Sequence, residues 1–240
     1  MSVPFDVKMS PLSQVDGSAR LIAGNTKVVV SVTGPIESKP RQELPTQASL
    51  EIVVRPSRGL SSTREKVLED LLRSVLQLVI VRYKFPRQLF QIVVQFLATD
   101  LDSEGSVIVS GETAAAGADY TANELSCALN CSYFALIDAN VPLFNSFAAV
   151  SMVIDKDGNY VTTPSLSELQ KSSSHHVVCF DIRDKKASKI LLIESDGSFT
   201  ELELIKVVEK GSRICEEVHQ SFQRPTIEEK IQKDFIWSDK

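Results

Sequence analysis

This 240-residue sequence has no apolar run long enough to cross a membrane. A membrane span needs roughly 18 or more consecutive apolar residues, whereas one of the longest apolar stretches, 76–81, contains Gln77 and is followed by Arg82. The first ten residues lack the basic flank and apolar segment of a secretory signal. There is no glycine-rich nucleotide-binding loop either. We therefore expect an intracellular protein that needs no membrane and no dinucleotide cofactor.

Cysteine and histidine are scarce, with four and three residues. No two cysteines form a Cys-x-x-Cys pair, so a structural zinc site is disfavoured, and we expect buried, reduced thiols. His175 and His176 are adjacent, and adjacent side chains on a strand point to opposite faces and cannot easily share a metal. We expect these histidines at the surface or at a rim, and we expect neither a metal nor another cofactor. The four cysteines are Cys127, Cys131, Cys179 and Cys215.

The sequence also lacks a basic excess, because 26 lysines and arginines stand against 31 acidic residues, a formal net charge of −5. A protein that grips nucleic acid on its own usually carries a net positive charge. If this chain handles RNA, it does so through a local basic patch or as one wall of a larger assembly.

Apolar periodicity predicts a mixed α/β (α+β) order of strands and helices. Gly24-Asn25 predicts a hairpin turn, Gly34-Pro35 the end of a strand, and Pro225 an interruption of the last helix. Strands are predicted at 18–23, 26–33, 48–55, 89–98, 147–154, 161–163, 177–182 and 189–194, and helices at 61–83, 123–138 and 202–222.

The first helix carries apolar pairs at helical spacing, with Thr63 as the predicted N-cap and Lys66 three residues later. The expected domain limits are an N-terminal segment 1–13, a domain 14–222 with a flexible surface insertion at 100–120, and a charged C-terminal tail 223–240.

Several strings, in this order, resemble the RNase PH-like proteins. Two of them, Gly34-Pro35-Ile36 and the Arg-Gln-Glu-Leu-Pro string 41–45, are similar in particular to fungal ring subunits of the RNA exosome. The resemblance covers about residues 14–222. The remaining strings are Asp16-Gly17-Ser18, 24–28, Arg64-Glu65-Lys66, Pro86-Arg87-Gln88, 123–127 and 135–139.

The resemblance implies an RNase PH-like fold, a single domain with mixed sheets packed against central helices. It places this domain in a six-membered ring built from heterodimers of such subunits. It also implies cap subunits, an associated catalytic ribonuclease and RNA threading a central channel. The compartments that it implies are the nucleus, including the nucleolus, and the cytoplasm. An isolated ring subunit would expose unpaired strand edges, so contacts with partners are expected.

Active members of the family bind orthophosphate with a Gly-Gly-Thr-Arg string at the start of a central helix. Backbone N–H groups, the helix dipole and the arginine fork all favour an anion there. Here the matching stretch 122–125 is Ala-Asn-Glu-Leu, so both glycines and the arginine are absent, and Glu124 has the wrong sign. Glu124 is equally an ordinary first-turn residue of a helix.

Active members also carry aspartates in a strand-turn segment that matches 162–168, where only Glu168 keeps a carboxylate. A second phosphate-contacting arginine corresponds to Asp70 in this alignment. The degenerate former active-site positions are thus Asp70, Asn123, Glu124, Thr162 and Glu168, and no catalytic residue is expected.

Basic residues gather in two places, on the loop before the first helix and just after that helix. Such residues can contact phosphates without reading bases, but Arg64 and Lys66 could equally pair with Glu69 and Asp70 on the helix surface. The candidate RNA-binding residues are Arg55, Arg58, Arg64, Lys66, Arg82 and Arg87.

Three functions remain open. The favoured one is a non-catalytic subunit of the exosome ring that supports 3′-5′ RNA processing and degradation. The second is an active phosphorolytic 3′-5′ exoribonuclease with the same fold, and the third is an unrelated acidic scaffold.

Overall fold

The computed structural model describes residues 5–100, 121–156 and 158–234. The predicted insertion at 100–120 therefore lies outside the described residues except for Asp100. The elements are β1 (Phe5–Met9), β2 (Gly17–Ala23), β3 (Thr26–Glu37), β4 (Ser49–Arg55), α1 (Thr63–Val79), the 3-10 turn η1 (Arg82–Lys84), β5 (Gln88–Ala98), α4 (Ala122–Asp138), β6 (Ser146–Ile154), β7 (Tyr160–Thr162), α5 (Leu166–Lys171), β8 (Ser174–Arg183), β9 (Lys186–Gly197), α6 (Glu201–Val218), the π-helical turn η2 (His219–Gln223) and α7 (Arg224–Asp234).

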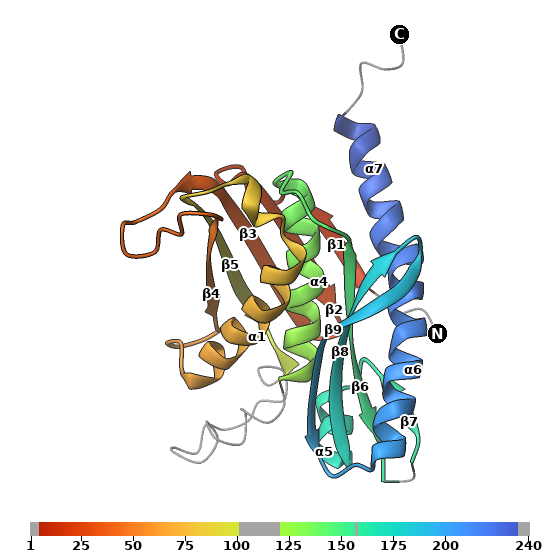
Figure 1. The fold of residues 1–240 in the computed structure, drawn as a ribbon. Helices are drawn as coiled ribbons and strands as arrows, with labels where there is room; N and C mark the ends of the chain where they lie inside the picture. The colour runs from red at the N-terminus through yellow and green to blue at the C-terminus, as the bar shows by residue number, and fades with distance from the viewer. Residues whose placement is uncertain (1–4, 101–120, 157, 235–240) are drawn as a thin grey trace.

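Two sheets enclose a central helical layer (Figure 1). The first has the strand order β1-β2-β3-β5-β4 and the second β7-β6-β8-β9. Helices α1 and α4 lie between the sheets, and α6 covers the outer face of the second sheet. Strand β4 runs parallel to β5 and the other pairs are antiparallel, so the predicted mixed fold is confirmed.

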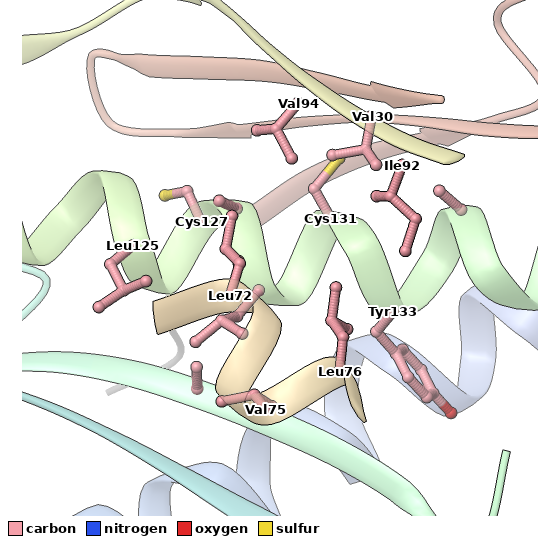
Figure 2. Packing of buried hydrophobic residues seen from close by; sticks show 14 of the residues in the cluster. Val30, Leu72, Val75, Leu76, Ile92, Val94, Leu125, Cys127, Cys131 and Tyr133 are labelled. Atoms are coloured by element: carbon pink, nitrogen blue, oxygen red, sulfur yellow. The ribbon is translucent and has the colours of Figure 1, made fainter. Parts of the chain in front are cut away.

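Helix α4 is the centre of the core. Every residue from Ala122 to Leu136 is buried, which explains the small side chains of this segment: both sheets and α1 approach it closely. Figure 2 shows Cys127 and Cys131 near Val30 and Val94 of the first sheet, with Leu72 and Leu76 of α1 on another side of the helix. All four cysteines are free and buried, as predicted.

The hairpin at Gly24-Asn25 is confirmed, since β2 and β3 pair antiparallel from Ala23 and Thr26 outward. The predicted strand end at Gly34-Pro35 is wrong. Strand β3 continues to Glu37 through a cis Gly34–Pro35 bond. A register shift against β5 between Thr33 and Ile36 absorbs the irregularity, and Gly34 donates its N–H to Asp16 Oδ2 at 2.8 Å.

Helix α1 spans Thr63–Val79 instead of the predicted 61–83, and its N-cap lies one residue earlier than predicted. Its N-cap is Ser62 and not Thr63, and the residue three positions on is Glu65 and not Lys66. The Ser62 N–H donates to Glu65 Oε2 at 2.6 Å, so the capping box is complete. Lys66 is therefore not a capping residue; it lies on the helix surface and pairs with Glu69.

The predicted interruption at Pro225 is also wrong, because α6, η2 and α7 follow one another as a continuous helical segment (Figure 1). The N–H of Arg224 bonds to the carbonyl of His219, five residues earlier. Such a π-helical turn is one way to carry a helix past a residue without an N–H.

Both ends of the described chain pack on the fold. Strand β1, which was not predicted, pairs with β2. At the far end of α4, Asp138 accepts hydrogen bonds from Ser10 and from the main chain of Ser18, and pairs with Lys230 of α7 at 2.6 Å. The domain limits 14 and 222 stay a prediction.

The prediction for the histidine pair is wrong for one of its members. His176 is fully buried between Ser174 and Ser195, whose hydroxyls lie 2.9 and 2.8 Å from its ring nitrogens. Burial lowers the pKa of His176 to about 4. His175 is partly buried and lies 3.7 Å from Asp196.

Among the described residues, no helix is both long and apolar enough to span a bilayer.

Candidate functional site at the start of helix α4

Two cavities of about 230 Å³ each border the first turns of α4. Consecutive residues of a helix point about 100° apart, so Asn123 faces one cavity and Glu124 the other. The Asn123 cavity is lined by Ala23, Gly24, Asn25, Asp100, Asn123, Ser126, Cys127, Ser151, Thr163, Pro164, Ser165 and Glu168. The Glu124 cavity is lined by Pro56, Ser57, Arg58, Leu60, Ser62, Arg64, Glu65, Phe96, Thr99 and Glu124.

The Asn123 side chain ties three segments together. Its Nδ2 donates to Asp100 Oδ2 at 2.8 Å and to the carbonyl of Pro164 at 2.6 Å. Its Oδ1 accepts from the hydroxyl of Ser151 on β6 at 2.8 Å. An amide suits this position because it donates and accepts hydrogen bonds at once, so the side chain links α4 to the three segments that hold its partners.

We expect Asn123→Ala to lower the free energy of unfolding by about 2 kcal/mol, because it removes buried hydrogen bonds and leaves the Pro164 carbonyl without this donor. Urea denaturation of the purified chain measures the change. Asn159→Ala, at an exposed position, is the control and should stay within about 0.5 kcal/mol of the parent. Equal stability of the two variants would contradict the role assigned to Asn123.

The Asn123 cavity is electronegative. Among the described residues that line it, Asp100 and Glu168 carry carboxylates and none is lysine or arginine. A phosphate dianion would meet negative charge without a cation to offset it. Glu168 is moreover engaged in a capping box, since its Oε2 accepts from the N–H of Ser165 at 2.7 Å.

Glu124 pairs with Arg64, which reaches it from the first turn of α1. Arg64 Nη2 lies 2.5 Å from Glu124 Oε1, and Arg64 Nη1 lies 3.6 Å from Glu65. Both side chains are largely buried, and among the described residues Glu124 Oε2 and Arg64 Nε have no hydrogen-bond partner. Burial raises the pKa of Glu124 to about 7, although the charge of Arg64 acts in the opposite direction.

The other predicted former active-site positions do not come together at α4. Asp70 lines neither cavity; it is exposed on α1 and lies 3.8 Å from Arg73. Thr162 ends β7 and pairs with Met152. Only Asn123, Glu124 and Glu168 lie at these cavities, and their assignment as former active-site positions stays a prediction.

The basic residues proposed to bind RNA are dispersed, and their side chains have different partners. Arg64 is held by Glu124, which is not the partner expected from helix spacing, whereas Lys66 pairs with Glu69 at 2.7 Å as expected. Arg87 lies 3.3 Å from Glu43, and Arg82 donates to the carbonyl of Ala48 at 3.5 Å. Arg55 and Arg58 are exposed.

Sequence reasoning did not find Asp100, Ser151 or the carbonyl of Pro164 as partners of Asn123, nor Arg64 as the partner of Glu124. Each is separated from its partner, Asn123 or Glu124, by at least 23 positions, and no local pattern marks such pairs. In the described part of the chain, no group of three or more His, Cys, Asp or Glu side chains is placed to hold a metal.

The arrangement matches a known family. Residues 4–142 match the RNase PH family model, described as the 3′ exoribonuclease family, domain 1. The chain belongs to this family. Its predicted resemblance to RNase PH-like proteins is thereby confirmed.

Similar proteins with this domain are components of the exosome. The chain is 39% identical to exosome complex component RRP46 of Saccharomyces cerevisiae over 227 residues, which cover 93% of this chain and 95% of that protein. It is 28% identical to exosome complex component rrp46 of Schizosaccharomyces pombe, over 86% and 82% of the two chains. The crystal structure of rice Rrp46 superposes with a TM-score of 0.77 at 25% identity, covering 94% of this chain and 95% of that one.

Proposed function

We propose that this chain is a non-catalytic subunit of the RNA exosome ring, where it supports 3′-5′ RNA processing and degradation. The partners are other RNase PH-like ring subunits, with which it forms a heterodimer in a six-membered ring, together with cap subunits and an associated catalytic ribonuclease. It acts in the nucleus, including the nucleolus, and in the cytoplasm. The similarity to exosome components over nearly the full chain supports this assembly.

The arrangement of side chains at the first turn of α4 supports the loss of catalysis. Phosphorolysis needs an anion held by N–H groups and cations. Here the Asn123 amide binds Asp100 and Pro164 in that region, and Arg64, the nearby cation, is held by its contact with Glu124. An active phosphorolytic enzyme would need a cation where the Asn123 cavity has two carboxylates.

The purified chain is expected to release no nucleoside diphosphate from an RNA tail in the presence of orthophosphate. Chromatography of products from a 3′-labelled oligoadenylate measures this, with an active RNase PH-type enzyme as the positive control. The same assay without phosphate tests hydrolysis. Phosphate-dependent shortening that increases in proportion to the concentration of this chain would sink the non-catalytic assignment.

The chain is also expected to enter a stable heteromeric particle when it is co-expressed with other exosome ring subunits. Size-exclusion chromatography with mass measurement checks this. A chain that stays monomeric and monodisperse under these conditions would contradict its membership of the ring.

We further propose that the basic loop before α1 contacts RNA in the channel. Arg55→Glu with Arg58→Glu is expected to weaken RNA protection by the assembled particle, because each reversal replaces attraction to phosphate by repulsion. Arg213→Glu on α6, at an exposed position, is the control. Unchanged protection of a threaded RNA would remove this loop from the channel wall.

A further inference from the structure

A groove of about 570 Å³ runs along the outer edge of the first sheet, beside β4. One wall is a stripe of α1 formed by Lys66, Glu69, Arg73 and Gln77. We call this space the edge groove. It is lined by Arg41, Gln42, Leu44, Ser49, Leu50, Glu51, Ile52, Val53, Lys66, Glu69, Arg73, Gln77, Arg82 and Leu89.

The floor of the edge groove offers unused main-chain groups. Among the described strands, β4 has β5 as its single neighbour. In a parallel strand, alternate residues point their N–H and C=O toward and away from the neighbouring strand. The N–H of Val54 donates to Glu69 Oε1 at 3.0 Å, so Val54 points away from β5. Leu50 and Ile52 share this orientation, and among the described residues no other segment bonds their main chain on this side.

The two ends of this open edge are closed by the chain itself. Glu69 occupies the Val54 end, and at the other end Ala48 donates its N–H to the carbonyl of Arg82 at 3.0 Å. Only the main-chain groups of Leu50 and Ile52 therefore remain for a partner. At about 3.3 Å per residue, this length fits an extended segment of about five residues and not the edge of another large sheet.

Charge further restricts the occupant. The lining carries four cations, Arg41, Lys66, Arg73 and Arg82, and two carboxylates. Both carboxylates already have partners, since Glu51 accepts from Gln91 at 2.8 Å and Glu69 from Val54 and Lys66. Of the cations, Lys66 pairs with Glu69 and Arg73 lies 3.8 Å from the exposed Asp70. The lining itself keeps two more cations than carboxylates, which favours Asp or Glu side chains in the occupant.

We propose that an acidic, extended segment of another exosome subunit, a loop or a tail, adds to β4 in the edge groove. Its main chain bonds to Leu50 and Ile52, its apolar side chains contact Leu44 and Val53, and its carboxylates face Arg73 and Arg82. This is strand addition to an exposed edge. The proposal rests on the proposed membership of the exosome.

The edge groove suits a peptide better than RNA. Strand-spaced amides and carbonyls match a polypeptide main chain. The described residues of the lining include no aromatic side chain on which a base could stack, and a phosphate backbone would pass Glu51. Lys66 and Arg82, which are also candidate RNA-binding residues, are in this view protein contacts.

Residue-resolved hydrogen exchange of the Leu50 and Ile52 amides tests the proposal. We compare the free chain with the particle formed by co-expression with exosome ring subunits. These two amides are expected to exchange at least about 100-fold more slowly in the particle. The amides of Glu51 and Val53, which point to β5, are the internal reference and stay protected in both.

Arg73→Glu supplies the charge test, because Arg73 is about half exposed and its change leaves the core intact. In the particle, Arg73→Glu is expected to restore most of the fast exchange of the Leu50 and Ile52 amides, whereas Arg213→Glu on α6 has no such effect. A third sample contains the free chain with an oligoadenylate as an RNA probe.

Protection that appears in the particle and weakens in Arg73→Glu supports the proposal. A particle whose Leu50 and Ile52 amides exchange as in the free chain overturns it and leaves exosome membership intact. Protection unaffected by Arg73→Glu rejects an acidic occupant. Protection produced by oligoadenylate alone assigns the groove to RNA, and failure to form any particle removes both proposals.

Discussion

Gly17→Ala is expected to lower the free energy of unfolding by about 3 kcal/mol or more, since one added methyl group would overpack the core. Gly17 begins β2 at the point where the end of α4 crosses it. A Cβ there would lie 2.2 Å from the main-chain nitrogen of Ala139 and 2.6 Å from the carbonyl oxygen of Ala135. Both are backbone atoms, so no side chain can rotate away and the helix itself must move.

Urea denaturation of the purified chain gives the unfolding free energy of Gly17→Ala. The control is Gly24→Asn in the hairpin turn. Gly24 has a positive φ of 57° but open space around it, and asparagine tolerates this backbone region. We expect the control to lose less than about 1 kcal/mol. If Gly17→Ala is as stable as its parent, the close approach of α4 to β2 is not a constraint on this fold.

Glu124 is expected to make the chain less stable as the pH rises from about 4.5 to about 7. In the unfolded chain its carboxyl has an ordinary pKa of 4.5, and burial raises the pKa to about 7 in the folded chain. Between these values the folded state binds more protons than the unfolded state, so the unfolding free energy falls with rising pH. A difference of this size corresponds to about 3 kcal/mol over the whole window.

Glu124→Gln removes this titration, and the measurement is the difference in unfolding free energy between parent and variant at several pH values. The subtraction is needed because His176, with a lowered pKa of about 4, contributes in the opposite sense. Its share is lost as the pH falls below about 6.5, the value in the unfolded chain. The difference between parent and variant should fall steadily between pH 4.5 and 7.

Glu209→Gln is the matched control, because Glu209 pairs with Arg213 on the exposed face of α6 at 2.7 Å. Its pH profile should run parallel to that of the parent. A flat difference for Glu124→Gln would show that the pairing with Arg64 outweighs burial. The constant loss caused by leaving Arg64 without this partner does not change the slope.

The sequence-based prediction was wrong about one helix cap and one proline, and it missed one short strand. Thr63 and Ser62 are both acceptable N-caps, and only the position of Glu65 against the Ser62 N–H decides between them. Pro225 ordinarily ends a helix, but a π-helical turn and the contact of Lys230 with Asp138 hold α7 on the fold. Strand β1 is short and was predictable only from its pairing with β2.

For the candidate site, the sequence alone revealed which phosphate-binding residues of the family are absent. The loss of the glycines and of the arginine at 122–125 is visible without coordinates, and it directed attention to the start of α4. It could not show that Asn123 joins Asp100, Ser151 and Pro164, since these groups are brought together only by the packing of both sheets on one helix.

The order of strands β2 to β9 and of helices α1, α4 and α6, the hairpin at Gly24-Asn25, the buried cysteines and the family followed from the sequence alone, because local patterning and short strings determine them. The tertiary structure alone decided that Arg64 contacts Glu124, that His176 is buried, and that, among the described residues, β4 leaves the main chain of Leu50 and Ile52 open. Pairing and burial depend on which distant segments meet, and no local spacing in the chain encodes that.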